Sequence, residues 1–238
     1  MRTDAERVST GMPGLDELLN GGVPKGRVIL VSGASGTGKT TFGMQFLYNS
    51  ALEGEPCLFI TLEESKDKIM EDMKGVGMDI TGIEGFHVAG GSVADMLYMS
   101  KKSGAGLNDF LMEIKGMVEK TGSKRVVIDS VNLFLMLFET DEERRRALLS
   151  LSKLLGQLGC TALLTCEVKE NTLDISWYGF EEFVVDGVIT LYNIREKSSF
   201  LQGIAVRKMR GVNHRKTIAP YKITDKGIVV YTDQPFIS

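Results

Sequence analysis

The chain has 238 residues, of which 43% are hydrophobic, and it is long enough to bury a core as one domain spanning residues 1–238. Its 28 basic and 31 acidic residues give a formal net charge of −3, so no overall positive field favours nucleic acid or an anionic membrane. The longest apolar stretch, residues 126–138, contains polar residues and falls short of the roughly 20 residues that a membrane span needs. A disordered or membrane-spanning protein is therefore not expected.

The N-terminus and the cysteines indicate the compartment. Residues 1–7 lack the apolar core of a secretory signal, which predicts a cytoplasmic protein. Cys57, Cys160 and Cys166 are sparse, odd in number, and lie in or beside apolar runs. This arrangement favours reduced, packed thiols over disulfides or a metal site.

Strand-like and helix-like segments alternate over the first two thirds of the chain. Short apolar, β-branched runs predict strands at residues 27–32, 57–62, 125–129 and 161–167. Helical spacing predicts helices at residues 40–53, 65–76, 107–121 and 141–158. The alternation predicts an α/β fold with a mainly parallel central sheet flanked by helices, and a ligand at the carboxyl ends of its strands.

The pattern changes from residue 186 onwards. Shorter alternating runs predict C-terminal antiparallel strands at residues 187–193, 203–209, 217–223 and 227–231. Residues 225–227 are expected to form a turn. The glycine-rich stretch 82–106 predicts surface loops around a short strand at residues 86–89.

A phosphate-binding loop is predicted at residues 33–41. The sequence GASGTGKT, residues 33–40, has the Walker A spacing, follows a predicted strand and precedes a predicted helix. Its glycines let the backbone approach an anion, and the strand-to-helix turn aims backbone N–H groups at it. The motif alone is compatible with ATP or GTP. The expected nucleotide-binding residues are Ser35, Gly36, Thr37, Gly38, Lys39, Thr40 and Thr41.

Two of these side chains, and one acid further along, have expected roles in catalysis. Lys39 is expected to contact the β and γ phosphates, and Thr40 to offer its hydroxyl to Mg²⁺. Asp129 ends an apolar strand, where a Walker B aspartate would help to hold Mg²⁺. The alternative for Asp129 is a purely local role as a cap of the following turn.

Two consecutive acids, Glu63 and Glu64, end another predicted strand. Either carboxylate could orient and deprotonate the water that attacks the γ phosphate. The competing interpretation is that Ser65 caps a helix and the preceding acids favour its positive end. The sequence leaves open which of the two would be the general base.

With these motifs placed, the chain resembles the KaiC-like branch of the RecA superfamily of P-loop ATPases over nearly its whole length. The resemblance rests on residues 9–26 (STGMPGLDELLNGGVPKG) before the loop, on the pair Glu63 and Glu64, and on FVVDGVI at 183–189 and KMRGVNH at 208–214. The family's best-known member has two such domains and phosphorylates itself. This sequence has one domain and no recognisable phosphorylation motif, so autokinase activity is unsupported.

The resemblance implies a ring, usually a hexamer, with nucleotide between adjacent subunits. It places Lys208 and Arg210 in catalytic positions facing a neighbour's γ phosphate, and His214 at the nucleotide across the interface. A spacing of two on a strand points Lys208 and Arg210 to the same face, and an arginine so placed would stabilise transition-state charge. From spacing alone, a solvated basic edge strand is the alternative.

Two further segments are ambiguous. Large apolar residues at 131–138 either form a partner surface or continue into a buried helical turn. Residues 169–182 occupy the place of a DNA-binding loop in recombinases, but Lys169 is the only basic residue among four acids, so DNA is not an expected partner. Trp177 and Tyr178 are expected to pack or make subunit contacts more readily than to stack on a base.

The leading hypothesis is therefore an ATP-binding, Mg²⁺-dependent ATPase that is complete only as a homo-oligomer and acts on an unidentified protein partner. The alternatives are an ATP-dependent switch or scaffold that hydrolyses little, and a recombinase-like ATPase stimulated by DNA.

Overall fold

The computed structural model describes residues 6–91, 106–170, 174–196, 199–234 and 236. Within them, nine strands form a central sheet in the order β11-β10-β9-β8-β3-β7-β6-β4-β5, and two short strands, β1 and β2, pair separately. The strands are β1 (Arg7–Val8), β2 (Val23–Pro24), β3 (Val28–Gly33), β4 (Cys57–Thr61), β5 (Phe86–Ala89), β6 (Arg125–Asp129), β7 (Thr161–Glu167), β8 (Gly187–Glu196), β9 (Ser199–Met209), β10 (Ile218–Thr224) and β11 (Gly227–Val230). The helices are α1 (Leu15–Leu18), α2 (Lys39–Leu52), α3 (Lys66–Gly75), α5 (Leu107–Thr121), α6 (Val131–Leu135), α7 (Asp141–Gln157) and α8 (Glu181–Val184).

The predicted fold class is confirmed. Strands β8, β3, β7, β6, β4 and β5 are parallel, and β9, β10 and β11 continue the sheet in antiparallel fashion. Helix α2 begins at Lys39, one residue earlier than predicted, because Gly38 adopts the left-handed conformation that ends the loop. The strands β8 and β9 are longer than predicted because they pair with each other as far as residues 196 and 199.

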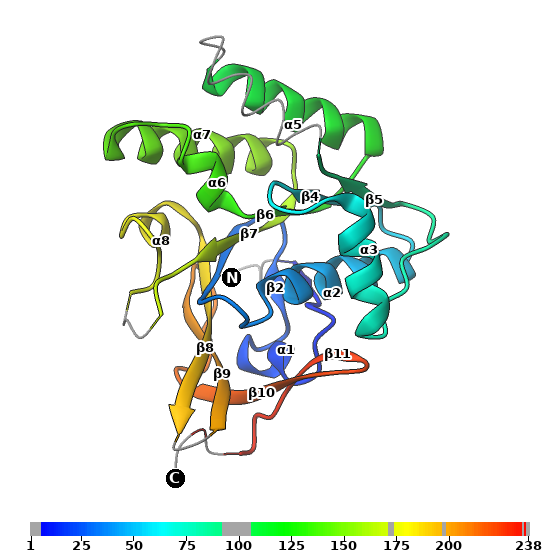
Figure 1. Cartoon of the computed structure of the whole chain (residues 1–238), viewed down its shortest axis with the longest axis vertical. Coiled ribbons are helices and arrows are strands. Elements are labelled where there is room, and N and C mark those ends of the chain that lie inside the picture. The colour runs from blue at the N-terminus through cyan, green and yellow to red at the C-terminus, as the bar shows by residue number, and fades with distance from the viewer. Residues whose placement is uncertain (1–5, 92–105, 171–173, 197–198, 235, 237–238) are drawn as a thin grey trace, which may run out of the picture.

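Helices cover both faces of the sheet (Figure 1). On one side, α1, α2 and α3 pack over a core that includes Phe42, Phe46 and Phe59. On the other side, α5, α6 and α7 pack over a second core that includes Phe110 and Phe134. The central parallel strands β3, β4, β6 and β7 are buried on both faces, which accounts for their nearly continuous apolar sequences.

The strand that carries the predicted loop lies at the centre of the sheet. Strand β3 pairs with β7 on one side and with β8 on the other, both of them contributed by the last third of the chain. Its register places Gly33 opposite Leu191 of β8 and Glu167 of β7. The carboxyl ends of these parallel strands therefore meet at one edge of the sheet, as the alternating pattern predicts.

The apolar segment 131–138 mostly forms core. Helix α6 buries Val131, Phe134 and Leu135 completely, and Phe134 stacks on Phe110 of α5 with ring centroids 4.3 Å apart. Met136 alone among these residues is strongly exposed. The buried helical turn is thus the better description of this segment. Over the described residues as a whole, no helix combines the length and apolar character that crossing a bilayer requires.

All three cysteines are buried and unpaired, which confirms packed thiols. Burial raises the pKa of Cys160 to about 11 and that of Cys57 to about 12. Because folding raises the pKa of these thiols, their contribution to the free energy of unfolding is complete below the unfolded pKa of about 9. For Cys160 this contribution is lost as the pH rises through about 11.

We expect the native cysteines to react with a thiol reagent at pH 9 roughly 50-fold more slowly than the unfolded chain, since only about 1% of Cys160 is thiolate there. Reagent uptake with and without guanidinium measures this difference. In denaturant all three thiols should react together. A native thiol that reacts at the unfolded rate would contradict the burial.

Candidate nucleotide site

A tight glycine loop connects β3 to α2. Gly36 and Gly38 have φ angles of 73° and 85°, which residues other than glycine rarely adopt. A Cβ on Gly33 would lie 2.5 Å from the Thr37 Oγ1 and 2.8 Å from the Leu191 carbonyl oxygen, so this position has no room for a side chain. The glycines of the motif thus let the loop turn back over the end of β3, where the first N–H groups of α2 face outward as anion donors.

The loop forms one wall of a pocket of about 240 Å³. Its lining residues are Ser35, Gly36, Gly38, Lys39, Thr40, Glu63, Asp129 and Glu167. The structure therefore brings together most of the residues predicted for this site. Two predicted nucleotide ligands in the loop segment 33–41 do not line it: Thr37 is buried, and Thr41 lies one residue beyond the lining.

Lys39 and the two loop threonines are held by backbone carbonyls and side chains of the site. The Lys39 Nζ donates to the Ala34 carbonyl at 3.0 Å, and the Thr37 Oγ1 donates to the same carbonyl at 2.8 Å. The Thr40 Oγ1 donates to Asp129 Oδ2 at 2.8 Å. The Lys39 ammonium, the Thr40 hydroxyl and the Asp129 carboxylate thus lie together at the loop.

Asp129 is almost completely buried at the end of β6. Burial raises the pKa of its carboxyl group, and hydrogen bonds from Thr165 and Thr40 act against that rise. Both carboxylate oxygens accept a hydroxyl, Oδ1 from Thr165 and Oδ2 from Thr40. Asp129 therefore faces the pocket as an oriented acceptor, and the turn-cap alternative does not describe its contacts.

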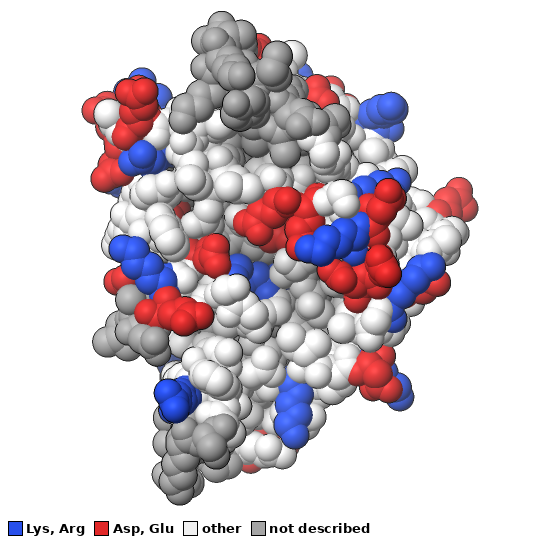
Figure 2. Space-filling view, viewed as in Figure 1, with Lys and Arg blue, Asp and Glu red and all other residues white. Residues whose placement is uncertain are grey.

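The two consecutive acids Glu63 and Glu64 have different surroundings. Glu63 lines the pocket, and its Oε1 accepts a hydrogen bond from the Ser130 hydroxyl. Glu64 instead pairs with Lys68 one turn along α3, at 2.5 Å, and Ser65 caps that helix by accepting from the Lys68 N–H. Figure 2 shows acidic and basic side chains mixed over α3. Ser65 thus caps the helix, as the competing interpretation expects, whereas a catalytic role stays a prediction for Glu63, which lines the pocket.

Three residues of the site were not predicted from the sequence. Ser130 contacts Glu63, Thr165 contacts Asp129, and Glu167 lines the pocket at the end of β7. The Asn132 side chain fixes the Glu167 backbone by accepting from its N–H at 2.7 Å and donating to its carbonyl at 3.3 Å. Ser130 and Glu167 lie at strand ends, a position that could have marked them as candidates, whereas Thr165 lies inside β7 and has no such signal.

Lys208 and Arg210 lie away from this pocket. They are near the amino-terminal end of the parallel strand β8, opposite the end that carries the nucleotide loop. Met209 pairs with Gly187 at the start of β8, whereas the loop residue Gly33 pairs with Leu191. The four residue steps from Gly187 to Leu191 along β8 correspond to about 13 Å. Strand β9 lies between β8 and β10, but β10 pairs only with its residues 203–205, so the part of β9 that carries Lys208 pairs with β8 alone. The alternative of a basic edge strand therefore stays open for this part.

The two cations also have different partners. The Lys208 Nζ donates to the Glu182 and Val185 carbonyls at 2.8 and 2.7 Å, at the end of α8, and burial lowers the pKa of this amine. Arg210 lies one residue beyond β9, is 53% exposed, and pairs with Asp186 at 3.3 Å. The charge of Arg210 also lowers the pKa of Lys208, so the two cations lie close together although the strand ends at Met209. Their shared role at a neighbour's phosphate stays a prediction.

His214 is half-buried, with its Nδ1 3.1 Å from the Arg215 carbonyl oxygen. Like Lys208 and Arg210, it is not among the pocket's lining residues. The three residues predicted to act on a neighbour's nucleotide are therefore separate from the loop of their own chain.

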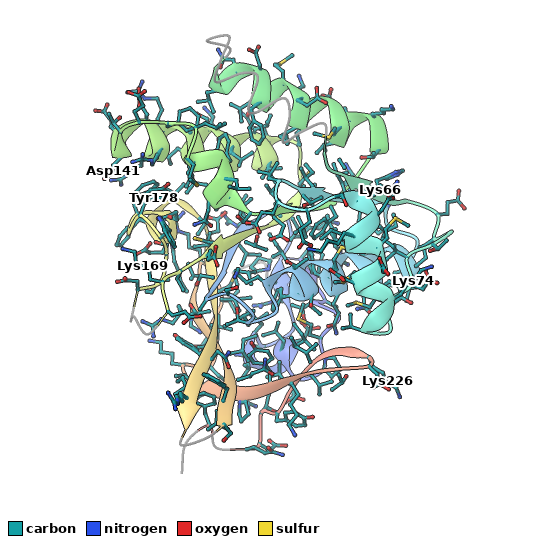
Figure 3. The ribbon with its side chains drawn as sticks, in the orientation of Figure 1. Lys66, Lys74, Asp141, Lys169, Tyr178 and Lys226 are labelled. Carbon is teal, nitrogen blue, oxygen red and sulfur yellow. The ribbon has the colours of Figure 1, made fainter. Side chains whose placement is uncertain are left out.

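The segment predicted to correspond to a DNA-binding loop packs on α7 instead. The Arg144 guanidinium of α7 lies 4.7 Å from the centroid of the Tyr178 ring, and Figure 3 shows Tyr178 near Asp141 at the start of that helix. The Lys169 ammonium lies 5.8 Å from the centroid of the Trp177 ring. Tyr178 therefore packs within the chain, as expected. Residues 171–173 of this segment lie outside the described residues.

A glycine loop between a central parallel strand and a helix, with an acid at the end of a neighbouring strand, defines a P-loop nucleotide-binding protein of the RecA class. A family model described as a KaiC ATPase matches residues 8–235. The chain belongs to the KaiC ATPase family and is a RecA-like ATP-binding protein.

Individual relatives agree with this assignment. The chain is 36% identical over 228 residues to the circadian clock oscillator protein KaiC of Synechococcus elongatus, covering 94% of this chain but 44% of that protein. It is 35% identical over 239 residues to a UPF0273 protein of Thermotoga maritima, covering 96% and 97% of the two chains. A crystal structure of a KaiC-like protein from Pyrococcus horikoshii matches with a TM-score of 0.82 and 35% identity, covering 95% and 99%.

Proposed function

We propose that this protein hydrolyses ATP with Mg²⁺, as one ATPase domain whose complete site forms between two copies of the chain. The observation that carries the proposal is the separation of charges. Glu63, Asp129 and Lys39 share one pocket, whereas Arg210 lies exposed near the other edge of the sheet. A single copy therefore supplies the acids and one lysine, and a neighbouring copy would supply the arginine.

The residues present suit Mg²⁺. The Thr40 hydroxyl and the Asp129 carboxylate lie 2.8 Å apart at the loop, and oxygen donors of this kind are the ligands that Mg²⁺ takes in nucleotide sites. Among the described residues no group of three or more His, Cys, Asp or Glu side chains could hold a metal, which fits an ion held partly by phosphate oxygens. When bound, Mg²⁺ would neutralise charge on the phosphates. Thr40 and Asp129 would hold it.

Glu63 is the residue that we assign as general base. In the proposed step a water oxygen bonds to the γ phosphorus, the water proton passes to the Glu63 carboxylate, and the bond to the oxygen bridging the β and γ phosphates breaks to release ADP. The Ser130 hydroxyl occupies one carboxylate oxygen of Glu63 and so orients the other. Lys39 would balance the phosphate charge. Glu64 takes no part, because it is paired with Lys68.

The assembly we propose is a ring, with a hexamer as the expected size from the family resemblance. In a head-to-tail contact, the loop edge of one copy faces the opposite edge of the next, and such contacts close into rings. Arg210 would stabilise charge on the neighbour's γ phosphate, Lys208 would keep α8 in place beside it, and His214 would lie near the same nucleotide. An unidentified protein partner would receive the resulting conformational change.

The proposal is tested by phosphate release from ATP at increasing protein concentration. We expect specific activity to rise with concentration, because the pocket of an isolated copy has no neighbour to supply an arginine. EDTA should abolish activity, and Lys39→Ala should abolish both activity and ATP binding. If the protein binds ATP but releases phosphate no faster than Glu63→Gln, the alternative of an ATP-dependent switch describes it better.

A further inference from the structure

The C-terminal strand β10 passes directly behind the nucleotide loop. Tyr221 and Ile223 are two residues apart on this strand and so point to the same face. The Tyr221 hydroxyl donates to the Thr37 carbonyl at 2.5 Å, and both residues are buried. A Cβ on Gly38 would lie 2.6 Å from Cδ1 of Ile223, which shows how closely loop and strand approach.

The hydrogen bond from Tyr221 fixes the orientation of one peptide group. In a trans peptide the carbonyl of one residue and the N–H of the next point in opposite directions. With the Thr37 carbonyl held toward β10, the N–H of Gly38 points away from the strand, toward the pocket that Gly38 lines. That N–H is one of the donors through which such a loop binds phosphate.

The strand that carries Tyr221 is itself firmly held. Strand β10 pairs with β9 and β11, and Gln45 of α2 ties β11 down. The Gln45 Oε1 accepts from the Ile228 N–H at 2.6 Å, and its Nε2 donates to the Ile228 and Gly11 carbonyls at 3.1 Å each. In Figure 3, Lys226 at the turn between β10 and β11 lies on the same side of the molecule as Lys74 of α3. The hydroxyl of Tyr221 is thus presented to the loop from a rigid support.

We propose that Tyr221 is a positioning residue of the nucleotide site, whose hydroxyl holds the Thr37–Gly38 peptide with its N–H toward the bound phosphates. The inference rests on nucleotide binding at the loop, and it does not depend on hydrolysis or on assembly. Burial also raises the pKa of the Tyr221 phenol, so the hydroxyl remains a donor over the range in which the protein would be assayed.

The test is the affinity for ADP of Tyr221→Phe, which keeps the buried ring and removes the hydroxyl. Free rotation of the Thr37–Gly38 peptide should weaken ADP binding roughly three- to tenfold, the range expected for one net hydrogen bond. Calorimetric titration with ADP measures this directly. In turnover assays KM for ATP should rise by a similar factor and kcat should remain within about twofold, because the interaction is made equally before and during the reaction.

A matched control is Tyr48→Phe. Tyr48 lies on α2 and packs against the same core, and no hydrogen bond of its hydroxyl occurs among the described residues. This variant should bind ADP like the wild type. Circular dichroism melts of both variants show whether either has lost stability.

The outcomes separate the two proposals. Unchanged ADP affinity in folded Tyr221→Phe would overturn the role of Tyr221 and leave the nucleotide site standing. So would an affinity loss that merely follows a drop in melting temperature shared with Tyr48→Phe. If the wild type binds no ADP, or if Lys39→Ala binds it equally well, the nucleotide site itself is wrong and the role of Tyr221 fails with it.

Discussion

Replacing Glu63 with glutamine is expected to lower the turnover number for ATP by about 10²- to 10⁴-fold, the usual contribution of a general base. Glutamine keeps the size of the side chain and can still accept the hydrogen bond from Ser130, but it cannot take a proton from water. Affinity for ADP should change little, because no phosphate ligand of the loop is altered. Phosphate release at saturating ATP, together with ADP titration, measures the two quantities separately.

Glu64→Gln is the matched control for this variant. It makes the same chemical change one residue later, at a side chain whose partner is Lys68 on the surface of α3. Its turnover should remain within about threefold of the wild type, since exposed ion pairs of this kind contribute little. If Glu64→Gln is the inactive variant and Glu63→Gln the active one, the assignment of the base is reversed.

The second large effect is expected for Arg210→Ala. Removing an arginine that stabilises charge on the transferred phosphoryl group costs about 10³- to 10⁵-fold in turnover in related reactions. ADP should still bind, because Arg210 does not line the pocket of its own chain. The decisive measurement is the turnover number at high protein concentration. Dilution alone would separate the copies and so mimic the loss of the arginine.

Arg27→Ala provides the control for Arg210→Ala. Arg27 and Arg210 both lie 3.3 Å from Oδ1 of Asp186, and both are about half exposed. Only Arg210 belongs to the motif whose spacing matches the family. Turnover of Arg27→Ala should therefore stay near that of the wild type, and an equal loss in both variants would indicate that the shared contact with Asp186 is merely structural.

Mixing two inactive variants tests the source of the arginine. A copy of Arg210→Ala still has Glu63, and a copy of Glu63→Gln still has Arg210, so some contacts in a mixed assembly contain both groups. In an equal mixture roughly a quarter of the head-to-tail contacts would be complete. Activity should appear on mixing. A mixture as inactive as its components would place the arginine outside the neighbour's site.

The sequence predicted the local parts of this molecule well. Buried parallel strands read as continuous apolar runs, and the bounds of β6 and β7 match those predicted from such runs. The loop motif also identified most of the residues that line the pocket, because glycine and lysine at that spacing act within one short turn. Where the structure of a segment depends on its own residues alone, the local sequence pattern is sufficient to predict it.

What the sequence did not predict depends on which strands become neighbours. Thr165 reaches Asp129 only because β7 pairs with β6, and Tyr221 reaches Thr37 across 184 positions of the chain. Glu63 and Glu64 differ because Ser130 donates a hydrogen bond to Glu63, whereas Lys68 forms an ion pair with Glu64. Neither strand order nor side-chain direction at a strand end is encoded in a local pattern, so these contacts required the structure.

The central position of β3 has a consequence for synthesis. The strand that leads into the nucleotide loop is synthesised long before its two hydrogen-bonding neighbours, both of which lie beyond residue 160. A growing chain therefore exposes an apolar strand with two unsatisfied edges until β7 and β8 have been made, and contacts between such distant segments form slowly. Nascent chains of this protein should consequently need protection from aggregation, and products that stop before β8 should carry the loop motif without the ability to bind nucleotide.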